Sequence, residues 1–170
     1  MNKIKIKKIA TAAVFSAVIA ACAWVYIPTP FGINLTFSLF AVCLTAFCLD
    51  IKSAFAATAV YITLGAIGLP VFSQFSGGIG VLFGVSGGFL WGFLLTVVVC
   101  GVAKNNLKKT IKYLLMIFSV LLCHTVGVIQ YSIVSGNDFL ISFLTASLPF
   151  LIKDIILVFL AELIAKKVKI

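Results

Sequence analysis

Residues 65–93 read GAIGLPVFSQFSGGIGVLFGVSGGFLWGF and hold nine of the thirteen glycines of the chain, one proline and no charged side chain. Glycine lets backbones approach a neighbouring helix or a ligand closely, because no Cβ stands in the way. Within a membrane, irregular backbone is tolerated only where it is buried in protein or lines a wet cavity. Small residues also let membrane helices pack tightly. The stretch therefore has two interpretations, the wall of a small-molecule site and a helix-packing surface.

The chain around this stretch is strongly apolar. Of its 170 residues, 63% are hydrophobic and 10% are charged, and the mean hydropathy is +1.27. Soluble domains carry about 25% charged residues, so the composition predicts an integral membrane protein. At about 20 residues per span, a chain of this length holds roughly five to seven helices and no separate soluble domain.

Prolines, the glycine stretch and short polar segments divide the apolar sequence. We expect an all-α membrane protein with six transmembrane helices, which form a single integral membrane domain over residues 1–170. The expected spans are residues 9–27, 35–49, 54–69, 85–103, 113–134 and 149–165.

The lysines predict the orientation of these spans. Six spans place both termini and two loops on one side, where twelve of the thirteen lysines then lie: Lys3, Lys5, Lys7, Lys8, Lys52, Lys104, Lys108, Lys109, Lys112, Lys166, Lys167 and Lys169. Cytoplasmic segments of membrane proteins are enriched in lysine and arginine. Both termini are therefore predicted to be cytoplasmic, in a multi-pass protein of the cell membrane.

The thirteenth lysine, Lys153, stands beside Asp154 inside the last span. Counted from the cytoplasmic Lys166, the pair lies about 20 Å along the helix, in the outer part of the membrane. Ionisable residues inside a membrane are functional by default. Adjacent helical residues point about 100° apart, so the two charges need not pair with each other. The alternative is that Lys153 extends to the headgroups and Asp154 balances its charge.

The sequence shows no complete set of catalytic residues. No GxxxxGK[ST] motif provides an ATP site, and His124 is the single histidine, which leaves triad chemistry without support. The five cysteines lie in apolar runs without CxxC spacing, so neither a disulfide framework nor a metal site is expected. The lysines do not form a basic face of the kind that binds nucleic acid. We expect no enzyme activity, no cofactor and no nucleic-acid partner.

Five sequence segments resemble one transporter family. GLPVF at residues 68–72, the following SGGIGVLFG and SGGFLWGF, and LPFLIKD at 148–154 are similar to motifs of the biotin-specific substrate-binding subunit of energy-coupling-factor (ECF) transporters, the BioY family. PTPFGINLTFSLFAV at 28–42 resembles its proline turn. The chain departs from the family where GPTGGY reads GVSGGF at 84–89, where Ser38 replaces glutamine, and where Leu157 replaces a lysine that Lys153 would supply.

The resemblance implies a six-helix subunit that captures biotin from outside. It also implies three partners within the membrane assembly, a transmembrane coupling subunit and two cytoplasmic ATPases. Asp154 and Lys153 would provide the main polar contacts to biotin. Further substrate-binding candidates are Thr36, Phe72, Gln74, Ser76, Gly77, Gly78 and Phe89.

Small residues recur on the first helix. Ala13, Ala17 and Ala21 lie four residues apart, and so do Ala12, Ser16 and Ala20. Such stripes admit another helix closely. We expect the first stripe to dock the coupling subunit, with packing inside the subunit as the alternative.

Other functions remain open at this point. A substrate-binding subunit for a different vitamin has the same architecture. A stand-alone secondary transporter is a further alternative, although many transporters contain internal repeats and this sequence shows no evident two-fold self-similarity. An intramembrane enzyme would need a nucleophile and a base, which the sequence does not bring together.

Overall fold

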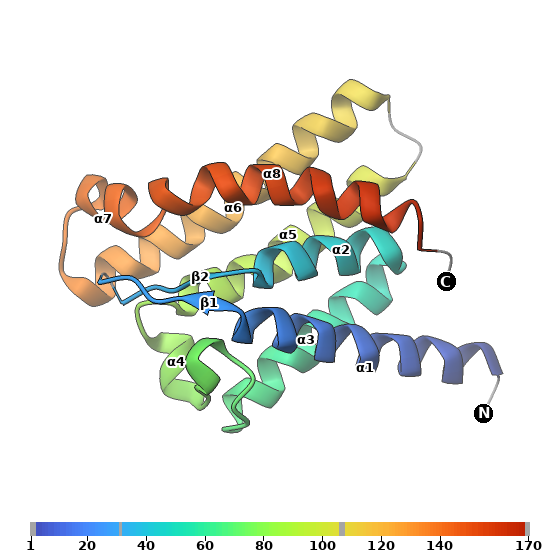
Figure 1. Cartoon of the computed structure of the whole chain (residues 1–170), viewed down its shortest axis with the longest axis horizontal. Coiled ribbons are helices and arrows are strands. Elements are labelled where there is room, and N and C mark those ends of the chain that lie inside the picture. Colours follow the sequence, from blue (N-terminus) through green and yellow to red (C-terminus); the bar gives the residue numbers. More distant parts are fainter. Residues whose placement is uncertain (1–2, 31, 106–107, 169–170) are drawn as a thin grey trace.

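The computed structural model describes residues 3–30, 32–105 and 108–168, so Lys169 lies outside the described residues. Eight helices, one short 3-10 turn and two short strands make up this part of the chain: α1 (Lys3–Trp24), β1 (Tyr26–Ile27), β2 (Leu35–Thr36), α2 (Ser38–Cys48), α3 (Ile51–Ala66), η1 (Ser73–Phe75), α4 (Ile79–Phe83), α5 (Gly87–Lys104), α6 (Lys109–Ser135), α7 (Phe139–Ala146) and α8 (Leu148–Ala165). The long helices form one bundle (Figure 1). An all-α fold was predicted, and the structure confirms it.

Local sequence explains where several helices begin and end. Asp50 caps α3, because its carboxylate accepts hydrogen bonds from the Ser53 backbone N–H at 3.3 Å and from the Ser53 hydroxyl at 2.8 Å. Pro149 lies in the first turn of α8, where a missing N–H leaves no hydrogen bond broken. Gly136 ends α6 with a φ of 70°, a left-handed conformation that glycine adopts without strain.

The proline-containing segment after α1 forms a hairpin. β1 pairs with β2 antiparallel, with Tyr26 opposite Thr36 and Ile27 opposite Leu35. The Phe37 N–H also donates to the Cys22 carbonyl of α1 at 3.3 Å. The hairpin, α4 and α7 lie toward one end of the molecule, and the start of α1 and the end of α8 lie at the other (Figure 1).

The glycine stretch divides into a loop and the start of a helix. Its first part, residues 68–84, is the loop that contains η1 and α4. Its second part begins α5, which packs along α6. A Cβ added at Gly88 would lie 2.6 Å from the Val126 carbonyl oxygen and 2.9 Å from the Gly127 Cα, so α6 touches the backbone of α5 here.

Substituting Gly88 with alanine is expected to lower the thermal stability of the detergent-solubilised protein, because α5 and α6 would have to separate. Overpacking of this kind costs about 1–3 kcal/mol. Thermal unfolding monitored by circular dichroism measures the loss. Gly80→Ala is the matched control, since no atom lies within 4 Å of a Cβ added there. Equal unfolding temperatures for both variants would contradict the close contact.

Three of the described helices are long and apolar enough to cross a membrane: α1, α5 and α6. α8 has 18 residues but carries Lys153, Asp154 and Glu162, and α2 and α3 are shorter, with 11 and 16 residues. The helices α1, α2, α3, α5, α6 and α8 correspond to the six expected spans. The number of spans and the cytoplasmic position of the termini stay predictions.

The orientation is testable by cysteine labelling. In a background without the five native cysteines, Ser135→Cys at the exposed end of α6 is expected to react with a membrane-impermeant maleimide added outside intact cells. Lys108→Cys, exposed at the start of the same helix, is the matched control and should react only after the cells are opened. The reverse pattern would invert the predicted topology.

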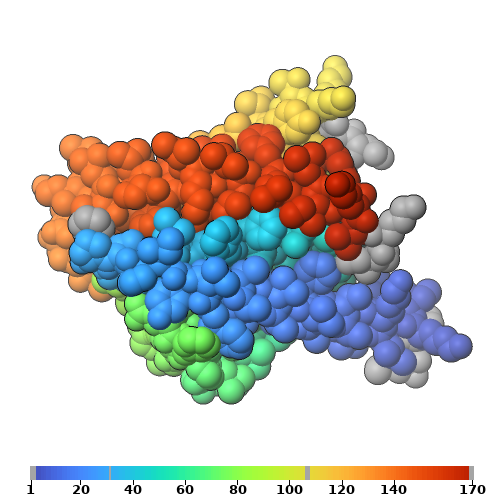
Figure 2. All heavy atoms as spheres, in the orientation of Figure 1, coloured from blue at the N-terminus to red at the C-terminus, as the bar shows by residue number. Residues whose placement is uncertain are grey.

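The two stripes of α1 face in different directions. Ser16 and Ala20 are buried against the bundle, and Ala12 is half-buried. Ala13, Ala17 and Ala21 are exposed. In the space-filling view, α1 lies along the outer surface of the molecule and its first turns extend beyond the bundle (Figure 2). The stripe expected to dock a partner is therefore available for one, and docking itself stays a prediction.

Candidate functional site

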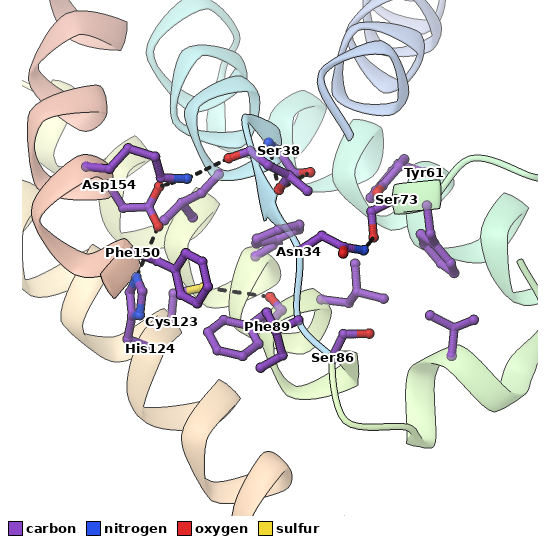
Figure 3. A pocket seen from close by; sticks show the side chains of 18 residues that line it. Asn34, Ser38, Tyr61, Ser73, Ser86, Phe89, Cys123, His124, Phe150 and Asp154 are labelled. Carbon is purple, nitrogen blue, oxygen red and sulfur yellow. Dashed lines mark hydrogen bonds and ion pairs between the residues drawn. The ribbon is translucent and has the colours of Figure 1, made fainter. Parts of the chain in front are cut away.

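A pocket with an open mouth lies between the hairpin and the helices, and its cavity volume, measured with a water-sized sphere, is about 80 Å³. The lining is mostly apolar, with a few polar groups (Figure 3). It consists of Ile33, Asn34, Thr36, Ser38, Leu39, Tyr61, Phe72, Ser73, Val81, Ser86, Phe89, Leu90, Phe93, Cys123, His124, Phe150, Lys153 and Asp154.

Asp154 is the buried carboxylate of this pocket, with 6% of its surface exposed. Its Oδ2 lies 3.2 Å from His124 Nε2, and its Oδ1 lies 2.9 Å from Lys153 Nζ. The Lys153 ammonium is close enough for an ion pair but lacks hydrogen-bond geometry, so Oδ1 has no hydrogen-bond donor among the described residues. Buried polar atoms are nearly always hydrogen-bonded, and a ligand N–H that replaced the Lys153 contact would give Oδ1 a hydrogen-bond donor.

Lys153 connects α8 to the hairpin. Its Nζ donates to the Thr36 carbonyl at 2.6 Å and lies 5.9 Å from the centre of the Phe37 ring. An ammonium has three N–H donors, and these contacts leave at least one of them for a ligand. The sequence left open whether Lys153 and Asp154 pair, and in the structure their charged atoms lie 2.9 Å apart.

Oδ1 of Asp154 is itself covered by its neighbours. A ligand N–H therefore reaches this oxygen only when a neighbouring side chain moves. Lys153 is the nearest charged candidate, and its four-carbon stem is flexible. On binding, the ligand would therefore replace the contact between Lys153 and Asp154 Oδ1.

The loop after α3 provides the opposite wall. Asn34 of the hairpin donates through Nδ2 to the Ser73 hydroxyl at 3.0 Å, and the Gln74 amide donates to Asn34 Oδ1 at 2.9 Å. Gln74 and Phe75 both have positive φ values, 59° and 53°, a conformation that is uncommon for residues other than glycine. Asn34 and Ser73 point toward one another and are joined by this hydrogen bond (Figure 3).

The structure brings five of the predicted binding residues into the lining: Thr36, Phe72, Phe89, Lys153 and Asp154. The other four, Gln74, Ser76, Gly77 and Gly78, do not line the pocket. Gln74 and Ser76 lie behind the lining, since Gln74 holds Asn34 and the Ser76 hydroxyl donates to the Ser73 carbonyl at 2.7 Å. The sequence located the loop, but it could not show which of its side chains turn inward.

Several lining residues were missed by the sequence reasoning, above all Asn34, Ser73 and His124. His124 carried a usable signal, because it is an ionisable residue inside an expected span. Asn34 and Ser73 carried none, since their importance comes from a contact between segments 39 residues apart.

Glu162, the second acid on α8, is buried like Asp154 but does not line the pocket. Glu162 is 4% exposed, and its Oε1 accepts from Lys112 at 2.6 Å and lies 2.8 Å from Lys166. Glu162 is thus paired with two lysines near the end of the molecule where the chain termini lie, away from the pocket. Asp154 is the buried acid that a pocket ligand can meet.

Ser86 stands in a Gly-x-Ser-x-Gly pattern, residues 84–88, which in hydrolases joins a strand to a helix. Here α4 precedes it and α5 follows, with no strand leading into the turn.

The fold and the site together define a helical membrane protein with a pocket for a small molecule that has both polar and apolar parts.

Comparison with known proteins agrees with this class. The model of the BioY family matches residues 1–170. The chain is 33% identical over 164 residues to "Biotin transporter BioY" of Thermotoga maritima, covering 96% of both chains. It is 29% identical to "Probable biotin transporter BioY" of Pyrococcus horikoshii, covering 97% of this chain and 98% of the relative.

The fold also matches a solved structure described as the "S-component for biotin from an ECF-type ABC transporter", with a TM-score of 0.87 and 23% identity. The match covers 98% of this chain and 93% of the other. The chain belongs to the BioY family. This membership confirms the resemblance seen in the sequence and the expectation that the protein is not an enzyme.

Proposed function

We propose that this protein is the biotin-binding subunit of an ECF-type ABC vitamin importer in the cell membrane. The observation that carries the proposal is the Lys153–Asp154 pair, which lies in the wall of a mostly apolar pocket in a member of the BioY family. Similarity to relatives named as biotin transporters supports the choice of vitamin.

The chemistry of biotin suits this pocket. Its ureido ring has two N–H donors and a carbonyl acceptor, its thiophane ring is apolar, and its tail ends in a carboxylate. Asp154 accepts from a ureido N–H, and Lys153 donates to the carbonyl or pairs with the carboxylate. The aromatic side chains of Phe72, Phe89 and Phe93 offer apolar contact.

Partners are part of the proposal, because the sequence has no nucleotide-binding motif of its own. A transmembrane coupling subunit and two cytoplasmic ATPases would supply the energy for import. The exposed Ala13, Ala17 and Ala21 stripe is the proposed contact with the coupling subunit.

Isothermal titration calorimetry of the purified protein with biotin tests the binding role. We expect saturable binding of one biotin per chain. Heats no larger than dilution would reject the proposal, and preferential binding of a different vitamin in a parallel panel would reassign the substrate. Uptake that persists in cells lacking the ATPases would instead favour a stand-alone transporter.

A further inference from the structure

The sole histidine of the chain, His124, lies in the pocket wall without a role in the proposed function. It belongs to α6, and 4% of its side chain is exposed. Its Nε2 lies 3.2 Å from Asp154 Oδ2, and its Nδ1 lies 2.8 Å from the Ser147 hydroxyl. Ser147 and Asp154 are seven residues apart, two turns along the same face at the start of α8. The imidazole therefore bridges two points of that face.

These partners determine where the ring carries its proton. An ionised carboxylate only accepts hydrogen bonds, so the nitrogen that faces Asp154, Nε2, must be the donor. In the neutral ring Nδ1 then accepts, and the fully buried Ser147 hydroxyl donates to it. The tautomer assigned from this network is the one protonated at Nε2.

Both nitrogens of His124 are thus occupied by protein groups, and neither is left for a ligand. The ring also meets Phe89 edge-on, with centroids 5.7 Å apart and an interplanar angle of 87°. Its polar influence on a bound molecule must therefore pass through Asp154.

We propose that His124 is a positioning residue for Asp154, and this inference rests on the proposed function. By holding Oδ2 with an N–H from α6, His124 leaves Oδ1, which Lys153 contacts at 2.9 Å, as the carboxylate oxygen that a ligand N–H reaches when Lys153 moves aside. The torsion that turns a carboxylate is broad and roughly two-fold. Without His124, the two oxygens become equivalent, and Lys153 is free to occupy both. The pocket would then no longer present one free carboxylate oxygen of Asp154 beside the Lys153 ammonium.

Because the chain has one histidine, selective ¹⁵N-histidine labelling gives a spectrum of His124 alone. The protein is purified through a tag without histidine and without affinity for biotin sites. In the unaltered protein we expect a proton on Nε2, seen as a one-bond ¹⁵N–¹H coupling. An Nε2 without a proton would overturn the inference, and this measurement requires no variant to fold.

Binding measurements test the consequence. His124→Leu removes the donor and is expected to weaken biotin binding roughly tenfold, as for loss of a hydrogen bond to a charged group. His124→Gln can place an amide N–H near the position of Nε2 and should restore most of the affinity. Thr96→Val is the matched control, since Thr96 is fully buried and hydrogen-bonded but does not line the pocket. It should leave affinity unchanged.

A double-mutant cycle separates positioning from a merely structural role. In an Asp154→Asn background, His124→Leu should change affinity by less than about twofold, because its target is already altered. The same tenfold loss in both backgrounds would overturn the inference, as would failure of His124→Gln to restore binding in a folded protein. If unaltered protein does not bind biotin, the proposed function fails. If it binds and His124→Leu binds equally well, this inference alone fails.

Discussion

Asp154→Ala is expected to weaken biotin binding roughly 10- to 150-fold, the range that corresponds to loss of a hydrogen bond to a charged group. The substitution removes the buried carboxylate whose Oδ1 has no hydrogen-bond donor among the residues that the structure describes. Asp154→Asn keeps one acceptor without the charge, so its affinity for biotin should lie between those of the unaltered protein and Asp154→Ala. Calorimetric titration with biotin measures all three proteins.

The matched control for this experiment is Asp138→Ala. Asp138 is also an aspartate near the pocket end of the molecule, but it is exposed, and its side chain makes no capping hydrogen bond to α7. The Asp138→Ala variant should bind biotin as tightly as the unaltered protein. Unchanged affinity in a folded Asp154→Ala protein would remove Asp154 from the binding site.

Ala17→Trp should abolish biotin uptake by cells and co-purification with the coupling subunit, while calorimetric binding of biotin persists. The exposed stripe of small residues on α1 permits another helix to approach closely. A tryptophan side chain at its centre would hold such a helix away. Binding should persist because Ala17 does not line the pocket.

Leu114→Trp serves as the comparison. Leu114 is a 62% exposed apolar residue on α6, so the same bulk is added to outer surface on a different helix. Uptake with this variant should be normal. Loss of biotin binding in Ala17→Trp would show that the stripe matters for the subunit's own packing. Normal uptake with Ala17→Trp would place the docking surface elsewhere.

Much of the fold was predictable because its signals are local. Pro149 marked the start of the last helix, which begins at Leu148, and the lysine-rich segment at residues 104–112 marked the turn between α5 and α6. The β1–β2 hairpin was predicted only as a turn. A pair of two-residue strands has too little sequence pattern to be seen in advance.

The site was predictable in part for the same reason. Lys153 and Asp154 stood out because charge is expensive inside a membrane wherever it occurs. The partners of Asp154 depend on packing between distant segments, as with His124, which is 30 residues away. Gly127 is a similar case. A Cβ there would lie 2.5 Å from the Phe89 ring, so this glycine makes room for a pocket residue on another helix.

The pairing of Lys153 with Asp154 has an electrical consequence. Their charges are opposite and lie 2.9 Å apart, so together they carry no net charge. A membrane voltage acts on a net charge with about 2.3 kcal/mol per elementary charge per 100 mV, but on a neutral pair only through its dipole. A vitamin with a carboxylate tail would add an uncompensated charge to such a pocket. Any voltage sensitivity of capture should then follow the charge of the cargo, and a neutral ester of the same vitamin should be captured without it.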